Sequence, residues 1–106
     1  MTTSSKRTKP GPYRYDGPDT PIHPGAYIRE ELEARGWTQA KLAKLMDRPA
    51  RLVNDLCQAR RSVSAETALD LSRALGMSPK TWMNLQTSYD LAKAQQKRAR
   101  RRPASV

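Results

Sequence analysis

The side chains of this sequence that could do chemistry are mainly cationic. The 106 residues hold 20 Lys and Arg against 10 Asp and Glu, a formal net charge of +10. They contain no Ser/His/Asp or Cys/His set, no Gly-rich phosphate loop, no paired acids suited to a cleft and no spacing typical of metal ligands. We therefore expect no enzyme activity, cofactor, metal or small-molecule substrate. The charge instead favours binding of a polyanion, of which nucleic acid is the commonest.

Histidine and cysteine, two residue types that are common in reactive sites, occur once each. His23 stands in a turn bounded by prolines, where we expect neither metal binding nor catalysis. Cys57 cannot form an internal disulfide, fits a reducing compartment, and is interpreted as a small packing residue. The sequence has no apolar run of about 18 residues that would span a membrane, and its first residues lack a secretory signal. These features predict a cytoplasmic protein without membrane association.

The chain divides into a central domain and two basic ends. Residues 1–21 contain four of the eight prolines, three of them beside a glycine, and are predicted to be a flexible arm. Residues 95–106 carry five basic side chains and no acid, and are predicted to be a disordered tail. That tail is either a solvated segment or a nonspecific contact with DNA phosphates or an acidic partner. Residues 22–94 show helical spacing without a strand pattern, which predicts a small all-α domain.

Five helices are expected in that domain. The first runs from about residue 24 or 25 to 35, the second starts at 39, and the third starts at 49. The fourth lies between residues 64 and 76, and the fifth runs from 79 to about 94 or into the basic tail. The predicted N-terminal caps are Thr38, Ser64 and Ser78, and the predicted stops are Gly36 and Gly76.

A proline interrupts the apolar pattern between Thr38 and Leu56. Inside one long helix Pro49 would cost about 3 kcal/mol, because it lacks an N–H and clashes with the preceding turn. At the first position of a new helix it is favoured, since that N–H would be unpaired anyway. We therefore interpret Pro49 as the start of a second short helix, after a turn around Asp47 and Arg48. Two short helices so joined form a helix-turn-helix unit.

Several segments resemble a known family. Five residues fall at the spacing of the helix-turn-helix core of the lambda/434 repressor-like, or XRE, superfamily: Gln39, Ala43, Asp47, Val53 and Leu56. The flanking segments are more specific. IHPG at residues 22–25, followed by AYIREELEARG, resembles the opening of HigA antitoxins, and residues 66–94, with WMNLQTSYDL, resemble their end.

The resemblance covers about residues 21–94 and implies both a fold and a function. The fold is a five-helix lambda repressor-like domain. The function is that of an antitoxin that dimerises, binds double-stranded DNA and represses its own toxin–antitoxin operon. Such a protein also neutralises a HigB-type (RelE-like) toxin that cleaves mRNA.

The resemblance also implies which residues meet DNA. In this superfamily the third helix enters the major groove and the second crosses the phosphate backbone. The groove-facing positions correspond here to Ala50, Arg51, Asn54 and Asp55. The phosphate candidates are Gln39, with Thr38, Arg48, Arg60 and Arg61. The family further implies a dimer seam that corresponds to Trp82, Leu85 and Tyr89, which on the residues alone could equally be core.

Each groove-facing side chain has its own chemistry. Arg51 can bond guanine O6 and N7 together, worth about 1–3 kcal/mol of discrimination. Asn54 can pair with adenine or bond a phosphate. Asp55 can only accept, so it either faces a cytosine amino group or forms a salt bridge with Arg51 or Arg48. For Arg60 and Arg61 the alternative is a solvated pair in a loop.

Four departures from the family pattern lie beside the DNA-reading unit. Asp47 stands where glycine is usual, Arg48 where an apolar residue is usual, Pro49 in place of a Ser or Thr cap, and Gln58-Ala59 in place of Asn-Gly. They support one rival interpretation, a protein-interaction antitoxin with weakened DNA binding. A second rival is a solitary phage-type regulator with the same fold and no toxin. RNA binding through the two ends would lack an aromatic stacking signature.

Overall fold

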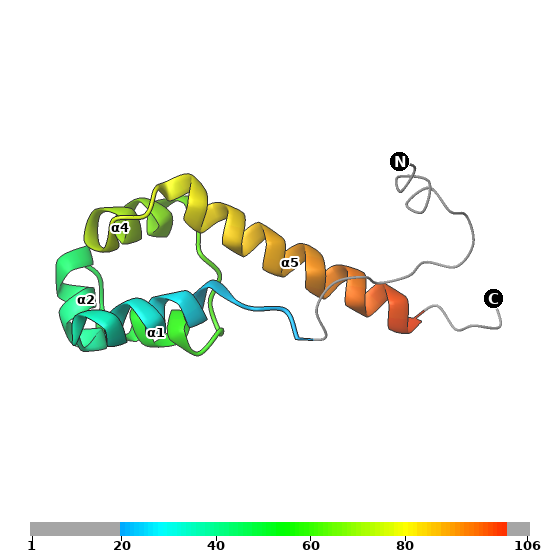
Figure 1. Ribbon diagram of the computed structural model, residues 1–106, viewed down its shortest axis with the longest axis horizontal. Coiled ribbons are helices and arrows are strands. Elements are labelled where there is room, and N and C mark those ends of the chain that lie inside the picture. Colours follow the sequence, from blue (N-terminus) through cyan, green and yellow to red (C-terminus); the bar gives the residue numbers. More distant parts are fainter. Residues whose placement is uncertain (1–19, 102–106) are drawn as a thin grey trace.

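The computed structural model describes residues 20–101, and within them the chain forms five α-helices and no β-strand. In Figure 1 the four shorter helices gather at one end, and α5 is a long rod that leads away from them. The prediction of an all-α, five-helix domain is confirmed. The helices are α1 (Pro24–Arg35), α2 (Gln39–Met46), α3 (Ala50–Cys57), α4 (Ala65–Leu75) and α5 (Pro79–Arg101).

Local signals in the sequence locate most helix ends. The hydroxyls of Thr38, Ser64 and Ser78 each accept a hydrogen bond from the backbone N–H three residues further on, at 3.0, 3.2 and 3.1 Å. These bonds satisfy N–H groups that have no partner within the first helical turn. Gly36 and Gly76 follow the last residues of α1 and α4. The predicted caps and stops are therefore confirmed.

α2 and α3 are separate helices that meet at a corner, as Pro49 led us to predict. α2 ends at Met46 and is capped by Asp47, whose φ of 59° and ψ of 44° are left-handed, and the Arg48 N–H donates to the Ala43 carbonyl at 3.0 Å. Asp is one of the few residues besides glycine that tolerates this conformation. One detail of the prediction is wrong. The ψ of Pro49 is extended, at 146°, so this residue precedes α3, which begins at Ala50.

The core lies between the apolar faces of all five helices. α2 packs on α3, α4 packs on both α2 and α5, and α1 packs on α3 and α5. Apolar residues at helical spacing form the buried face of each of these helices. They are Leu42, Ala43, Met46, Val53, Leu56, Ala68, Leu71 and Leu75, and Ile28 and Leu32 of α1 join them.

Trp82 belongs to this core. Its side chain is 0% exposed within one chain, so it has no surface left for a partner. Placing Trp82 in a dimer seam is therefore wrong, and the alternative of a core position holds. Leu85 packs half-buried against the same core, and Tyr89 lies against His23 with ring centroids 4.8 Å apart.

Gly25 allows α1 to approach α3 very closely. A Cβ atom at this position would overlap the Leu56 carbonyl oxygen and lie 3.1 Å from Cys57 Cα, both of them backbone atoms at the end of α3. Only a residue without a side chain fits here. The IHPG segment can now be explained, because His23 caps α1, Pro24 opens it and Gly25 sets its distance from α3.

A buried amide joins α5 to the loop that follows α3. Gln86 is 4% exposed, its Oε1 accepts from the Val63 N–H at 2.7 Å, and its Nε2 donates to Asp90 Oδ1 at 2.9 Å. A buried amide left unpaired would be costly, so these bonds fix the loop. Arg60 and Arg61 lie in that loop.

α5 continues through the basic residues to Arg101, so the prediction of disorder is wrong for residues 95–101. The segment KAQQKRARR is rich in strong helix formers, and its cations lie near the helix C-terminus, where the helix dipole favours them. The rest of the predicted tail, residues 102–106, and residues 1–19 of the predicted arm lie outside the described residues.

Ala59→Gly is expected to stabilise the domain by about 1 kcal/mol. Ala59 is exposed and adopts a φ of 62°, a left-handed conformation in which the Cβ atom is strained and glycine is not. Urea unfolding of both proteins measures the difference. Ala34→Gly, at an exposed position within α1, is the control and should destabilise by about 1 kcal/mol. If the Ala59→Gly variant were no more stable than the original chain, the left-handed backbone of Ala59 would not be strained.

Candidate nucleic-acid interface

Arg51 is the most accessible polar side chain of α3. Its side chain is 90% exposed, and its nearest charged partner is Asp55, with Nε 3.9 Å from Oδ2. The neighbouring residues Leu52 and Val53 are buried, so the arginine points away from the core. A guanidinium held on a short rigid helix and surrounded by solvent is free to bond a ligand that approaches this face.

A polar network joins the start of α2 to α3 and to the following loop. Asn54 Nδ2 donates to Gln39 Oε1 at 3.1 Å, and Arg60 Nη2 donates to Asn54 Oδ1 at 3.2 Å. The structure thus brings together three residues that sequence reasoning selected separately. Because Asn54 and Gln39 are half-buried, the bond between them also fixes the orientation of both side chains.

Asp55 has two cationic neighbours. It lies 3.9 Å from Arg51 and 3.5 Å from Arg60 Nη2. The expected salt bridge with Arg51 is present, the alternative with Arg48 is wrong, and the contact with Arg60 was not predicted. Its charge is therefore already compensated, which reduces the repulsion that it would exert on a polyanion.

Arg48 is engaged within the domain. Its Nη1 lies 2.6 Å from Asp70 Oδ2 of α4, and both side chains are mostly covered, at 27% and 19% exposed. Arg73 reaches the other oxygen of Asp70 at 3.6 Å and donates to the Met46 carbonyl at 3.3 Å. These contacts hold the corner against α4. The predicted phosphate contact of Arg48 thus competes with an intramolecular ion pair that the sequence did not reveal.

Arg61 lies beside the first turn of α3. It borders a hollow of about 380 Å³, together with Arg48, Pro49, Arg51, Leu52 and Asp55. Three guanidinium groups and one carboxylate, that of Asp55, therefore border one surface depression, whose net positive charge favours an anion. Thr38 and Gln39 lie at the N-terminus of α2, whose free N–H groups also favour an anion.

Comparison with known proteins identifies the family. A helix-turn-helix family model (HTH_3) matches residues 28–82. The chain belongs to the helix-turn-helix family. It is 40% identical over 76 residues to virulence-associated protein I of Dichelobacter nodosus, covering 71% of this chain and 70% of that protein.

Two solved structures of HigA-family proteins are similar to this helix-turn-helix protein, in agreement with the sequence resemblance. An addiction module antidote protein of the HigA family from Coxiella burnetii superposes with a TM-score of 0.73 at 36% identity, covering 77% of this chain and 90% of that one. The Pseudomonas aeruginosa antitoxin HigA, solved with the higBA promoter, superposes with a TM-score of 0.72 at 38% identity, covering 76% and 89%.

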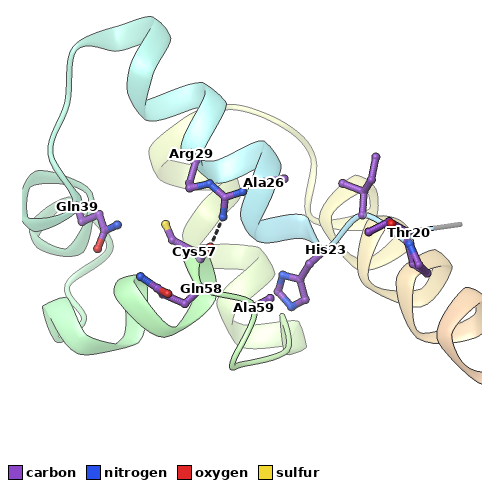
Figure 2. A pocket seen from close by; sticks show the side chains of 10 residues that line it. Thr20, His23, Ala26, Arg29, Gln39, Cys57, Gln58 and Ala59 are labelled. Carbon is purple, nitrogen blue, oxygen red and sulfur yellow. Dashed lines mark hydrogen bonds between the residues drawn. The ribbon is translucent and has the colours of Figure 1, made fainter. Parts of the chain in front are cut away.

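A second hollow of this helix-turn-helix protein lies where α1 meets the end of α3 (Figure 2). It measures about 570 Å³, and Arg29 crosses it to donate a hydrogen bond to the Cys57 carbonyl. Burial raises the pKa of the Cys57 thiol, so the thiol stays protonated. Cys57 is a packing residue, as interpreted from the sequence.

Within residues 20–101, no group of three or more His, Cys, Asp or Glu is arranged to hold a metal.

Three residues with clear tasks were missed by sequence reasoning. Arg29 and Gln86 tie distant segments together, and no local pattern reveals such contacts. His23 offered a signal, because a histidine followed by Pro-Gly at a helix start can cap that helix. Its Nδ1 accepts from the Gly25 N–H at 2.8 Å.

No helix among residues 20–101 is both long and apolar enough to cross a membrane.

The helix-turn-helix domain is expected to lose stability as the pH falls below about 6.5. Burial lowers the pKa of His23, an effect partly offset by a hydrogen bond with the Arg61 backbone and by the charge of Asp90. The unfolded chain then binds a proton near pH 6.5 that the folded chain binds only at lower pH. The contribution of His23 is therefore complete above pH 6.5 and disappears as the pH falls through the lowered pKa.

Urea unfolding at pH 7.5, 6.5 and 5.5 measures this dependence. His23→Asn keeps an acceptor at the cap and removes the only histidine of the chain, so its stability should vary less over this range. Parallel pH profiles of the two proteins would show that His23 is not the titrating group.

Proposed function

We propose that this chain is a DNA-binding antitoxin that represses its own toxin–antitoxin operon. One observation carries the proposal: α3 presents an exposed Arg51 beside a fixed Asn54, in a fold shared with a HigA antitoxin solved with promoter DNA. In this account α3 enters the major groove, and the start of α2 lies across the phosphate backbone.

The residues then divide between base and phosphate contacts. Arg51 bonds a guanine, Asn54 bonds an adenine or a phosphate, and Ala50 contacts the groove at the start of α3. Asp55 balances the two guanidinium groups beside it and accepts from cytosine when a base lies within reach. The phosphate contacts come from Thr38, Gln39, Arg60 and Arg61, with Arg48 available only if it leaves Asp70.

The proposed active species is a homodimer that reads two half-sites about one helical turn, or roughly 34 Å, apart. Leu85 and Tyr89 are the remaining candidates for its seam, because each keeps part of its surface exposed. The proposed protein partner is a HigB-type toxin that cleaves mRNA. Repression and toxin neutralisation are then two activities of one small protein.

Two measurements test the proposal. In a gel-shift assay, the full chain should bind DNA from upstream of its own gene at least about a thousandfold more tightly than a scrambled duplex of equal length, at the same salt concentration. Expression of the adjacent gene should arrest growth unless this chain is co-expressed. Rescue without a specific shift would instead support a protein-interaction antitoxin, and a shift with a harmless neighbouring gene would support a solitary regulator.

A further inference from the structure

Beyond Tyr89, residues 90–101 continue α5 as an arm of about three turns, in which no residue up to position 100 is buried. Gln86 is the last buried residue of the helix, and Tyr89 is the last that packs on another element by a ring contact. Residues 90–100 are all exposed or half-exposed, although α5 continues to Arg101. At 1.5 Å per residue this arm extends by about 18 Å. Figure 1 shows that it leads away from the end of the molecule where α2 lies.

One face of the arm is a row of cations. Lys93, Lys97 and Arg100 follow each other at intervals of four and three residues, the spacing that places side chains on one face of a helix. We call these three residues the basic stripe. Residues 91–106 contain no acidic residue, and no salt bridge found in the described part of the chain involves the stripe. Ala92, Gln95 and Ala99 occupy the opposite face.

The three positive charges of the basic stripe favour binding to a negatively charged surface. Like charges one turn apart destabilise an isolated helix by about 0.2–0.5 kcal/mol per pair, a repulsion that a polyanion would remove. Residues 90–101 contain no aromatic side chain, so the arm has no means of stacking the bases of single-stranded RNA. A regular array of phosphates is the ligand that a straight row of cations fits best.

We propose that the basic stripe binds the phosphate backbone of double-stranded DNA outside the site occupied by α3. The proposal rests on the proposed function for the identity of the nucleic acid. It assigns a second, sequence-independent contact to a segment that lies beyond residues 28–82, the part matched by the family model. The arm strengthens binding to DNA that extends past the operator, whereas α3 supplies the specificity.

The experiment compares two variants with the same loss of charge. The stripe variant is Lys97→Gln with Arg100→Gln, and the control is Lys80→Gln with Arg98→Gln, all four at exposed positions of α5. Dissociation constants are measured between 50 and 300 mM salt, for an operator duplex with flanking DNA and for a scrambled duplex of the same length. Circular dichroism checks that both variants keep the helix content of the full chain.

Each phosphate contact contributes about 0.9 to the slope of log K against log salt, so the stripe variant should lose about 1.8 of that slope for each protomer whose arm contacts DNA. Its affinity at 150 mM salt should fall by roughly tenfold, and equally for both duplexes, since phosphate contacts carry no sequence information. The control variant should stay within about twofold. Equal slopes for the two variants, or a loss confined to the operator, would overturn the proposal.

The two proposals fail in different ways. If the unmodified chain does not distinguish operator from scrambled DNA, the proposed function fails, but the slope difference on scrambled DNA still reports on the stripe. If recognition is specific and the slopes of the two variants coincide, only the stripe is refuted.

Discussion

Gly25→Ala is expected to destabilise the domain by about 3 kcal/mol, the largest effect of any single methyl group that we anticipate. The added carbon would overlap the Leu56 carbonyl, which belongs to the backbone of α3 and cannot rotate away. α1 would have to move outward. The core contacts of Ile28 and Leu32 would loosen with it, and both residues are buried.

Urea unfolding monitored by circular dichroism measures this loss. Glu30→Ala changes an exposed position of the same helix and should alter the stability by no more than about 0.5 kcal/mol. A Gly25 variant as stable as the Glu30 variant would mean that α1 can shift without cost. The close approach of α1 and α3 would then have no energetic importance.

Arg51→Ala is expected to weaken operator binding by about tenfold to a hundredfold for each half-site, because one bidentate contact with guanine is worth about 1–3 kcal/mol. Binding to scrambled DNA should change far less. The fold should tolerate the substitution, since the side chain is 90% exposed and Asp55 keeps Arg60 as a partner.

Arg61→Ala is the matched control, with the same loss of charge beside the same hollow. It should weaken operator and scrambled DNA by similar factors, as expected for a phosphate contact. Footprinting on the operator measures both variants. Unchanged protection by the Arg51 variant would exclude this residue from base recognition.

Much of the fold could be predicted because its signals are local. Thr38, Ser64 and Ser78 cap helices through bonds to the third residue that follows, so sequence and structure record the same short-range chemistry. Pro49 signalled the corner for a similar reason. Its exact role was missed, because an N-terminal proline has a suitable φ either just before or just inside a helix, and only ψ distinguishes the two.

The errors concern residues whose environment depends on distant segments. Arg48 pairs with Asp70, 22 residues away, and helical spacing says nothing about which elements will face each other. Trp82 lies on a stripe with Leu85 and Tyr89, but only the packing of α4 and α5 decides that it is fully enclosed. The sequence left the end of α5 open between residue 94 and the basic tail, because basic composition favours disorder there and helix propensity favours continuation, and the helix ends at Arg101.

The sequence yields the candidate site as a set of residues and not as a network. Arg51, Asn54 and Asp55 were selected one by one from a family pattern. The structure adds the bonds that connect Asn54 to Gln39 and Arg60, and these turn separate side chains into one surface. Such bonds join three segments and are not encoded in any one of them.

The central claim is that Arg51 bonds a guanine in the major groove, and one binding cycle tests it directly. The full chain and Arg51→Ala are each titrated with the operator and with operators in which single guanines are replaced by 7-deazaguanine, which lacks the N7 acceptor. The account predicts one position per half-site where this change costs the full chain about tenfold and leaves the Arg51 variant unaffected. Equal losses for both proteins at every guanine would contradict it.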